Sequence, residues 1–102
     1  MPLTKDFKDT VKARMERSPT FRRAVLREAI ECLLAGDVET GKVMLRDYIN
    51  GTIGFEELAD RTQTPPKSLM RMFGPSGNPQ AKNLFDVIAT LQQAEGVQFQ
   101  VR

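Results

Sequence analysis

The chain of 102 residues is long enough for one compact domain and too short for two that each bury a useful core. Hydrophobic residues make up 40% and charged residues 27%, which is typical of a soluble globular protein rather than a disordered one. No stretch approaches the roughly 18 apolar residues of a transmembrane helix, and the first ten residues lack the apolar core of a signal peptide. We therefore expect a cytoplasmic protein with no membrane partner.

The inventory of reactive side chains argues against an enzyme. The chain has no histidine and a single cysteine, Cys32, so the commonest general base and the usual ligands of a zinc site are missing. Lysine and carboxylate side chains can also catalyse reactions, but no pair of them stands in a recognisable catalytic arrangement. We expect no catalytic activity, no metal and no cofactor.

The net charge of +2 is unevenly distributed along the chain. Residues 37–62 carry a net charge of −3, whereas every charged residue from position 61 to position 85 is basic. These basic residues are Arg61, Lys67, Arg71 and Lys82. An acid-free basic stretch is expected where a protein meets a phosphate backbone. The alternative is a solvated surface that is basic by chance.

Capping residues and helical periodicity predict an all-α fold of five to six short helices. The expected helices run from a Thr4 cap to residue 17, and over residues 19–35, 38–49, 55–62, 66–73 and 80–95. Ser18 and Asp37 are expected N-caps, while Gly36 and Gly96 are expected stops.

Apolar residues at helical spacing predict which side chains face the core. The expected inward residues are Phe7, Val11, Met15, Phe21, Val25, Ile30, Leu33, Leu34, Val38, Val43 or Met44, Leu45, Ile49, Leu84, Phe85, Ile88 and Leu91.

The last residues, 97–101, alternate apolar and polar side chains with the period of a β-strand. A single strand cannot satisfy its own backbone groups, so we expect a short C-terminal strand that pairs with a second copy in a homodimer. A frayed terminus is the alternative. The single domain 1–102 would then consist of an N-terminal helical extension (1–36), a core (37–96) and the tail (97–102).

The expected helices over 55–62 and 66–73 meet the requirements of a helix-turn-helix. Ala59 is small where the second helix must cross the first, and Leu58 precedes it on the core side. Leu69 and Met72 anchor the second helix. The turn position four residues after the alanine, where glycine is usual, is occupied by Gln63. An ordinary helical hairpin in a bundle is the alternative, which the lack of acids around the second helix disfavours.

Four blocks follow one another with a distinctive order and spacing: Glu57-Leu58-Ala59, Lys67-Ser68-Leu69, Gly77-Asn78-Pro79, and the helical run from Leu84 to Leu91. On these residues, the sequence from Asp37 to the C-terminus resembles the antidote (antitoxin) proteins of bacterial addiction modules. That family belongs to the phage-repressor-like helix-turn-helix superfamily.

The resemblance implies a sequence-specific DNA-binding transcription regulator, an autorepressing antitoxin of a toxin-antitoxin module. Its partners would be a double-stranded DNA operator, a second copy of the chain and a cognate toxin protein. In a helix-turn-helix the second helix enters the major groove and presents its outer side chains to the bases. We expect base contacts from Pro66, Lys67, Ser68 and Arg71. We expect phosphate contacts from Arg61, Thr64, Lys82 and Asn83.

Two other functions compete with this interpretation. One is a protein-interaction module that neutralises a partner with little or no DNA binding. The other is an RNA-binding protein, which is less favoured because most aromatic residues here stand at core positions rather than where bases could stack on them.

Overall fold

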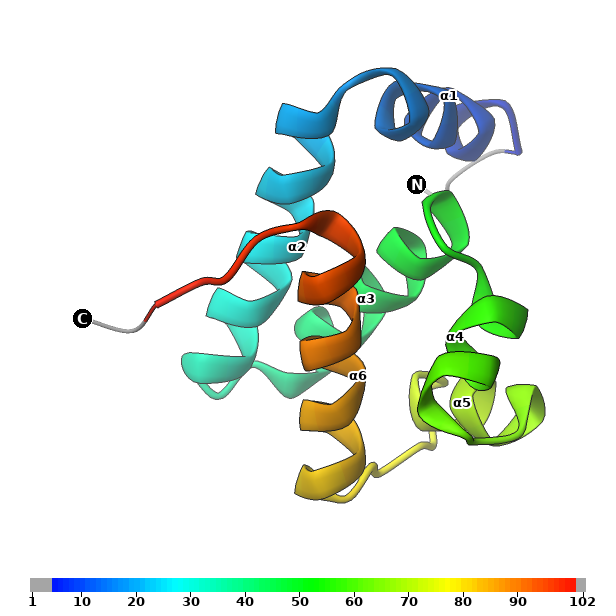
Figure 1. Cartoon of the computed structure of the whole chain (residues 1–102), viewed down its shortest axis with the longest axis vertical. Helices are drawn as coiled ribbons and strands as arrows, with labels where there is room; N and C mark the ends of the chain where they lie inside the picture. Colours follow the sequence, from blue (N-terminus) through cyan, green and yellow to red (C-terminus); the bar gives the residue numbers. More distant parts are fainter. Residues whose placement is uncertain (1–4, 101–102) are drawn as a thin grey trace.

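The computed structural model describes residues 5–100, and the side chains of residues 10–100, which form six α-helices (Figure 1). The helices are α1 (Lys5–Arg17), α2 (Pro19–Leu34), α3 (Val38–Gly51), α4 (Phe55–Thr62), α5 (Pro66–Met72) and α6 (Ala81–Glu95). The prediction of an all-α fold is confirmed, and the helix bounds lie within two residues of those expected.

Local chemistry explains where several helices begin and end. The Ser18 hydroxyl accepts a hydrogen bond from the Phe21 amide (3.1 Å), and the Asp37 carboxylate accepts one from the Thr40 amide (3.3 Å). Gly96 ends α6 in the left-handed conformation, with φ of 73°. These caps agree with the sequence prediction, whereas the Thr4 cap lies outside the described residues.

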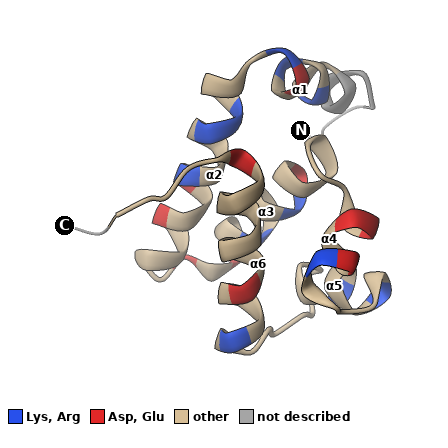
Figure 2. Ribbon diagram, in the orientation of Figure 1, with Lys and Arg blue, Asp and Glu red and all other residues tan. Residues whose placement is uncertain are grey.

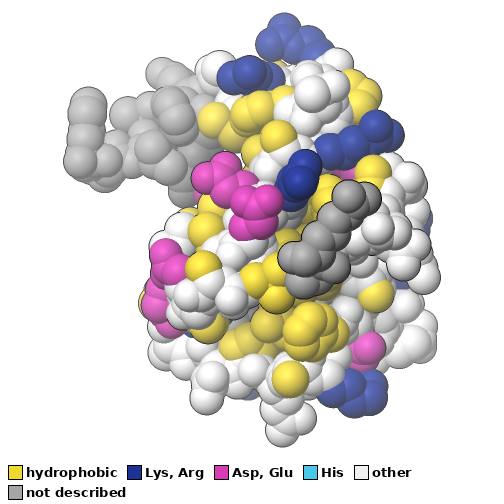
Figure 3. All heavy atoms as spheres, turned by 90° about the vertical axis from the view of Figure 1, so that its left-hand side faces the viewer, with side chains coloured by type: hydrophobic (Ala, Val, Ile, Leu, Met, Phe, Trp, Pro, Cys, Tyr) yellow, Lys and Arg dark blue, Asp and Glu magenta, His cyan; other side chains and the backbone are white. Residues whose placement is uncertain are grey.

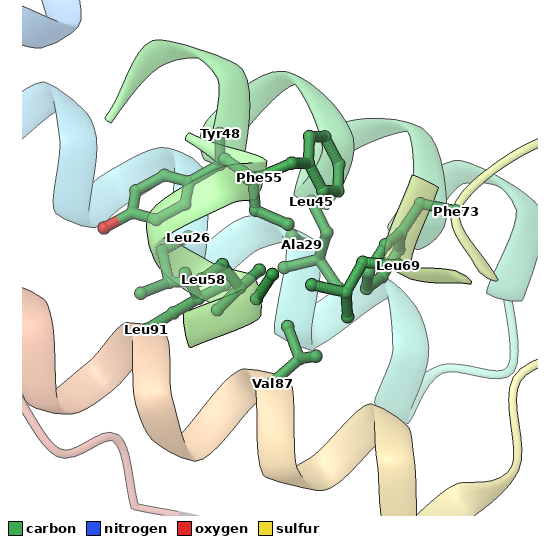
Figure 4. Close-up of a cluster of buried hydrophobic side chains, with 12 residues drawn as sticks. Leu26, Ala29, Leu45, Tyr48, Phe55, Leu58, Leu69, Phe73, Val87 and Leu91 are labelled. Atoms are coloured by element: carbon green, nitrogen blue, oxygen red, sulfur yellow. The ribbon is translucent and has the colours of Figure 1, made fainter. Parts of the chain in front are cut away.

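A single apolar core joins α2 to α6 (Figure 4). Its buried members are Leu26, Ala29, Leu45, Tyr48, Ile49, Phe55, Leu58, Ala59, Leu69, Phe73, Val87 and Leu91. Each large aliphatic side chain buried in this way contributes about 1.5–3 kcal/mol to folding. Because all five helices supply residues, the short helices α4 and α5 are held by the same core as the longer ones.

Some residues expected inside lie at the surface. Leu34, Val38 and Phe85 expose 60%, 44% and 60% of their area. The corner between α2 and α3 and the beginning of α6 lie at the periphery of the molecule, so no neighbouring helix covers these side chains (Figure 1). Of the two alternatives for α3, Met44 packs against the core and Val43 is exposed. The side chain of Phe7 lies outside the described residues.

The predicted C-terminal strand is not seen in the described part of the chain. Residues 97–100 have no regular secondary structure. The Val97 amide donates to the Gln92 backbone oxygen (3.0 Å), and the Phe99 amide donates to the Gln92 side-chain oxygen (2.9 Å). These bonds attach the tail to α6. No other segment within residues 5–100 pairs with the tail as a strand.

A cluster of polar side chains joins the N-terminal helices to α3 and α6. The Glu95 carboxylate, 5% exposed, accepts hydrogen bonds from the Tyr48 hydroxyl (2.5 Å) and from two nitrogens of the Arg22 guanidinium (3.1 and 3.2 Å). The same guanidinium donates to the Met15 backbone oxygen (2.8 Å) at the end of α1. Arg23 adds a longer ion pair to Glu95 (3.7 Å). Glu95 of α6 therefore binds α2 and α3 directly, and Arg22 extends the cluster to α1.

Burial raises the pKa of the Tyr48 hydroxyl above its usual value, and the hydrogen bond to Glu95 raises it further. An unfolded tyrosine releases its proton near pH 10, before the folded one does. The contribution of this difference to stability is therefore fully present below about pH 10 and is lost as the pH rises above it.

We expect the free energy of unfolding to fall above pH 10 by about 1.4 kcal/mol per pH unit from Tyr48 alone. Tyr48→Phe should lower the free energy of unfolding near pH 7 by about 1–3 kcal/mol, because Glu95 loses a hydrogen-bond donor. The variant has no hydroxyl at position 48 to titrate, so it should not show the fall in stability above pH 10 that comes from Tyr48. Urea unfolding of both proteins from pH 8 to 11.5 measures the difference, which should shrink as the pH rises. A difference that stays constant would refute the role assigned to the hydroxyl.

Candidate nucleic-acid interface

The helices α4 and α5 are joined by a turn of three residues, 63–65. Gln63 adopts the left-handed conformation, with φ of 54° and ψ of 40°, at the position where glycine would be free of strain. Its side-chain amide donates to the Asp60 carbonyl (2.6 Å), and the Thr64 amide donates to the Ala59 carbonyl (3.1 Å). These bonds hold the turn in a conformation that a residue other than glycine rarely adopts.

The inner faces of the two helices are packed into the core. Leu58, Ala59 and Leu69 are buried, and Met72 is half-buried against the core. The rings of Phe55, the first residue of α4, and Phe73, the residue after α5, lie 6.3 Å apart within the same cluster. The direction of the outer face of α5 is therefore fixed by Leu69 in the middle of the helix and by Phe73 at its end.

The outer face of α5 carries two cations and one apolar side chain. Lys67 and Arg71 are exposed, and neither side chain forms an ion pair or a hydrogen bond within the described part of the chain. They stand four positions apart, so they share one side of the helix. Met70 lies beside them with 49% of its area exposed. Pro66 and Ser68 are half-buried at the flanks.

The four residues expected to contact phosphates have different surroundings. Arg61 forms an ion pair with Glu57 (2.7 Å) and lines a hollow between α4 and the polar cluster of Glu95. Thr64 lines a separate hollow and donates to the Thr62 carbonyl (3.3 Å). The structure therefore does not bring Arg61 and Thr64 to one hollow.

The other two phosphate candidates lie in the first turn of α6. Lys82 is 83% exposed and forms an ion pair with Asp86 (3.0 Å), while Asn83 is exposed. Figure 2 shows α5 and the beginning of α6 at the same end of the molecule. The first turn of α6, with Lys82 and Asn83, therefore lies at the same end of the molecule as the expected base-contacting helix α5.

Acidic residues just outside positions 61–85 pair with two of the four cations of that acid-free stretch. Glu57 lies four residues before Arg61, and Asp86 lies four residues after Lys82, so each cation has a partner one helical turn away. Glu56 and Asp60 line the hollow that Thr64 shares. The unpaired positive charge of this region is consequently limited to the outer face of α5.

Sequence reasoning missed Lys42, a lysine of α3 whose relative exposure is only 2%. Its ammonium donates to the backbone oxygens of Gly77 (2.7 Å) and Gly74 (3.2 Å) and lies 3.4 Å from the Glu39 carboxylate. The available signal was its spacing, because position 42 falls on the same helical stripe as the buried Leu45 and Ile49.

The loop that Lys42 contacts is folded tightly beneath the end of α5. The Gly74 amide donates to the Arg71 carbonyl (3.1 Å), and the Gly77 amide donates to the Gly74 carbonyl (3.1 Å). A Cβ atom on Gly77 would overlap the backbone oxygen of Arg71, whereas one on Gly74 would make ordinary contacts at 3.5 Å. Only Gly77 of these two thus needs to be glycine for reasons of space.

The described residues contain no group of three or more side chains suited to hold a metal ion. No helix in the same part of the chain combines the length and apolar character required to cross a membrane. Comparison with known proteins finds no matching family model, no similar curated protein and no matching solved structure.

We expect Gly77→Ala to lower the free energy of unfolding by about 1–3 kcal/mol, because the loop must move to relieve the overlap with the Arg71 carbonyl. Gly74→Ala is the matched control in the same loop and should change stability by less than about 1 kcal/mol. Urea unfolding monitored by circular dichroism measures both. Equal effects of the two substitutions would show that the close approach at Gly77 is not a constraint.

Proposed function

We propose that the protein is a sequence-specific DNA-binding regulator in which α4 and α5 act as a repressor-like helix-turn-helix. The observation that carries this proposal is the outer face of α5, where Lys67 and Arg71 are exposed, share one side and lack acidic partners among the described residues. The opposite face is anchored by Leu69 and Phe73. A rigidly mounted, cationic helix is suited to enter a major groove.

The dimensions and chemistry of α5 fit that role. Seven residues form a helix about 10 Å long, and the major groove is about 12 Å wide. Arg71 and Lys67 donate to the O6 and N7 atoms of guanine, and Ser68 donates or accepts at either base type. Pro66 lies at the N-terminal end, which meets the bases first, and the exposed Met70 is placed to contact a thymine methyl group.

The phosphate contacts are assigned to the residues around this helix. The Lys82–Asp86 pair is exposed on both sides, so it is weak and a phosphate can replace the carboxylate. Asn83 adds a neutral donor in the same turn of α6. Arg61 and Thr64 remain candidates on α4 and in the turn, where Arg61 must exchange Glu57 for a phosphate.

From the resemblance of residues 37–102 to antitoxins, we further infer that the protein is a cytoplasmic, autorepressing antitoxin with a cognate toxin as its protein partner. The exposed side chains of Leu34 and Phe85 favour a protein-binding role in addition, and Figure 3 shows hydrophobic side chains gathered on the face shared by α2, α6 and the tail. A module that binds only a protein partner is the second candidate function.

Affinity for duplex DNA as a function of salt tests the regulator. A duplex selected from a random pool is the probe, and its affinity should fall steeply with salt, with a slope of about −0.9 for each phosphate contacted. Arg71→Ala should weaken binding to this duplex about 5- to 100-fold and binding to random DNA much less, since Arg71 reads a base. Lys82→Ala should weaken both to a similar degree.

Arg17→Ala is the matched control for this experiment. Arg17 is an exposed arginine in the last turn of α1, and its substitution should leave the affinity for both duplexes unchanged. Equal effects of Arg17→Ala and Arg71→Ala would remove α5 from the proposed interface. A wild-type protein that binds no duplex at low salt would overturn the regulator and favour the protein-binding module.

The regulator is further proposed to act as a homodimer through its tail. The backbone amides of Gln98 and Gln100 have no hydrogen-bond partner in the part of the chain that the structure describes, so a second tail lying antiparallel can supply acceptors for both. One helix-turn-helix reads only a half-site, and a two-fold dimer would read a palindrome.

Substitution of Gln98 separates strand pairing from side-chain packing. Gln98→Pro removes the unpaired amide and should shift the protein toward the monomer in light scattering, whereas Gln98→Ala keeps the amide and should leave the dimer intact. Deletion of residues 97–102 should also give a monomer. A dimer that survives the deletion excludes the tail as its basis.

A further inference from the structure

The buried ammonium of Lys42 joins α3 to the loop between α5 and α6. Its two backbone acceptors, Gly74 and Gly77, lie 32 and 35 residues further along the chain. The third neighbour, the Glu39 carboxylate, is 74% exposed and lies one helical turn earlier. The ammonium thus has two backbone hydrogen bonds and one ion pair within 3.4 Å.

The burial of a cation at this place requires an explanation. Removing an ammonium from water is costly unless hydrogen bonds replace those it loses, and most lysines in proteins remain exposed. Here the strongest replacement comes from two carbonyl oxygens of one loop rather than from a buried acid. The buried ammonium therefore stabilises the observed position of the loop, because it loses two hydrogen bonds if the loop moves away.

This loop sets the relation between the two cationic parts of the proposed interface. It begins at the end of α5, where the Gly74 amide bonds to the carbonyl of Arg71, and it leads to the first turn of α6 with Lys82. Gly77 packs closely against the backbone of Arg71 in α5, and its carbonyl accepts a hydrogen bond from Lys42 of α3. The loop is therefore held by contacts to both helices. Arg71 and Lys82 thus keep one spacing while both contacts persist.

We propose that Lys42 is a positioning residue for DNA binding, which holds the α5–α6 loop so that the base-reading face of α5 and the phosphate-contacting start of α6 meet one duplex together. This inference rests on the proposed regulator function. Lys42 touches no DNA in this arrangement, since its side chain is buried. Its effect on affinity is carried by Lys82 and Asn83.

A double-mutant cycle between Lys42 and Lys82 tests the inference. Lys42→Met retains the length of the side chain and removes the charge and the donors, and Glu39→Gln is the matched control that leaves the two loop carbonyls bonded. On the selected duplex, Lys42→Met should weaken binding about 5- to 30-fold and make the salt slope shallower by about 1, as expected for the loss of one phosphate contact. Glu39→Gln should leave both quantities unchanged.

The cycle separates positioning from general stability. In the Lys42→Met background, Lys82→Ala should have little further effect, because its contact is already lost. Measurements are made where circular dichroism shows every variant folded; if Lys42→Met does not fold, Lys42→Gln, which keeps an amide donor, replaces it. Amide exchange should accelerate more than tenfold at Gly77 and remain unchanged in the core of α2 and α3.

Three results would overturn the inference. Additive effects of Lys42→Met and Lys82→Ala, or a wild-type salt slope in Lys42→Met, would mean that Lys42 does not act through the start of α6. If Lys42→Met speeds amide exchange at Gly77 but leaves DNA affinity unchanged, the hydrogen bonds of Lys42 to the loop stabilise the fold only, and the proposed regulator function is unaffected. Failure of the wild-type protein to bind the duplex would instead refute the regulator function, and the positioning role with it.

Discussion

A helix of seven residues does not persist alone in water, because the first turn of a helix costs more conformational entropy than its hydrogen bonds return. The place of α5 is therefore decided by the burial of Leu69 and Phe73, which are 1% exposed each. This packing also decides the outer face, since a helix buried along one stripe presents the opposite one to solvent. Every role proposed for Lys67 and Arg71 depends on that anchoring.

The charges around α5 are organised by what surrounds the helix rather than by its own sequence alone. Arg61 and Lys82 each find a carboxylate one turn away on their own helices, and Lys42 finds the carbonyls of a loop. Lys67 and Arg71 find no such partner among the side chains of residues 10–100. Unpaired cations on a rigid helix give an attractive potential for phosphate that is not cancelled locally. The proposed base-reading helix therefore carries positive charge that no ion pair among the described side chains compensates.

Local signals in the sequence were sufficient for the elements and for part of the candidate site. The caps at Ser18 and Asp37 and the stop at Gly96 act within a few residues, so their consequences can be predicted without knowing the fold. The exposure of Lys67 and Arg71 follows from helical spacing once Leu69 is placed inside. The partners of Arg61 and Lys82 were also within reach, because acids four residues away on one helix are a local pattern.

Features that depend on distant segments could not be predicted in this way. Leu34 and Leu26 are both apolar residues of α2, and only the position of the neighbouring helices determines that Leu26 is buried and Leu34 is exposed. The hydrogen-bond partners of Lys42 are a second example, because they lie more than 30 residues away along the chain. The tail has the alternation of a strand, yet pairing requires a second set of backbone groups that its own sequence does not describe.

Gln63 has a consequence for how the protein can vary. A left-handed conformation costs a residue with a side chain about 1 kcal/mol relative to glycine, and the side-chain bond to Asp60 offsets part of this. The residue ends α4 and carries no charge, so exchanging it for glycine alters the stability of the turn and leaves the cations of α5 in place. Stability can therefore vary at position 63 without any change in the number of cations on α5.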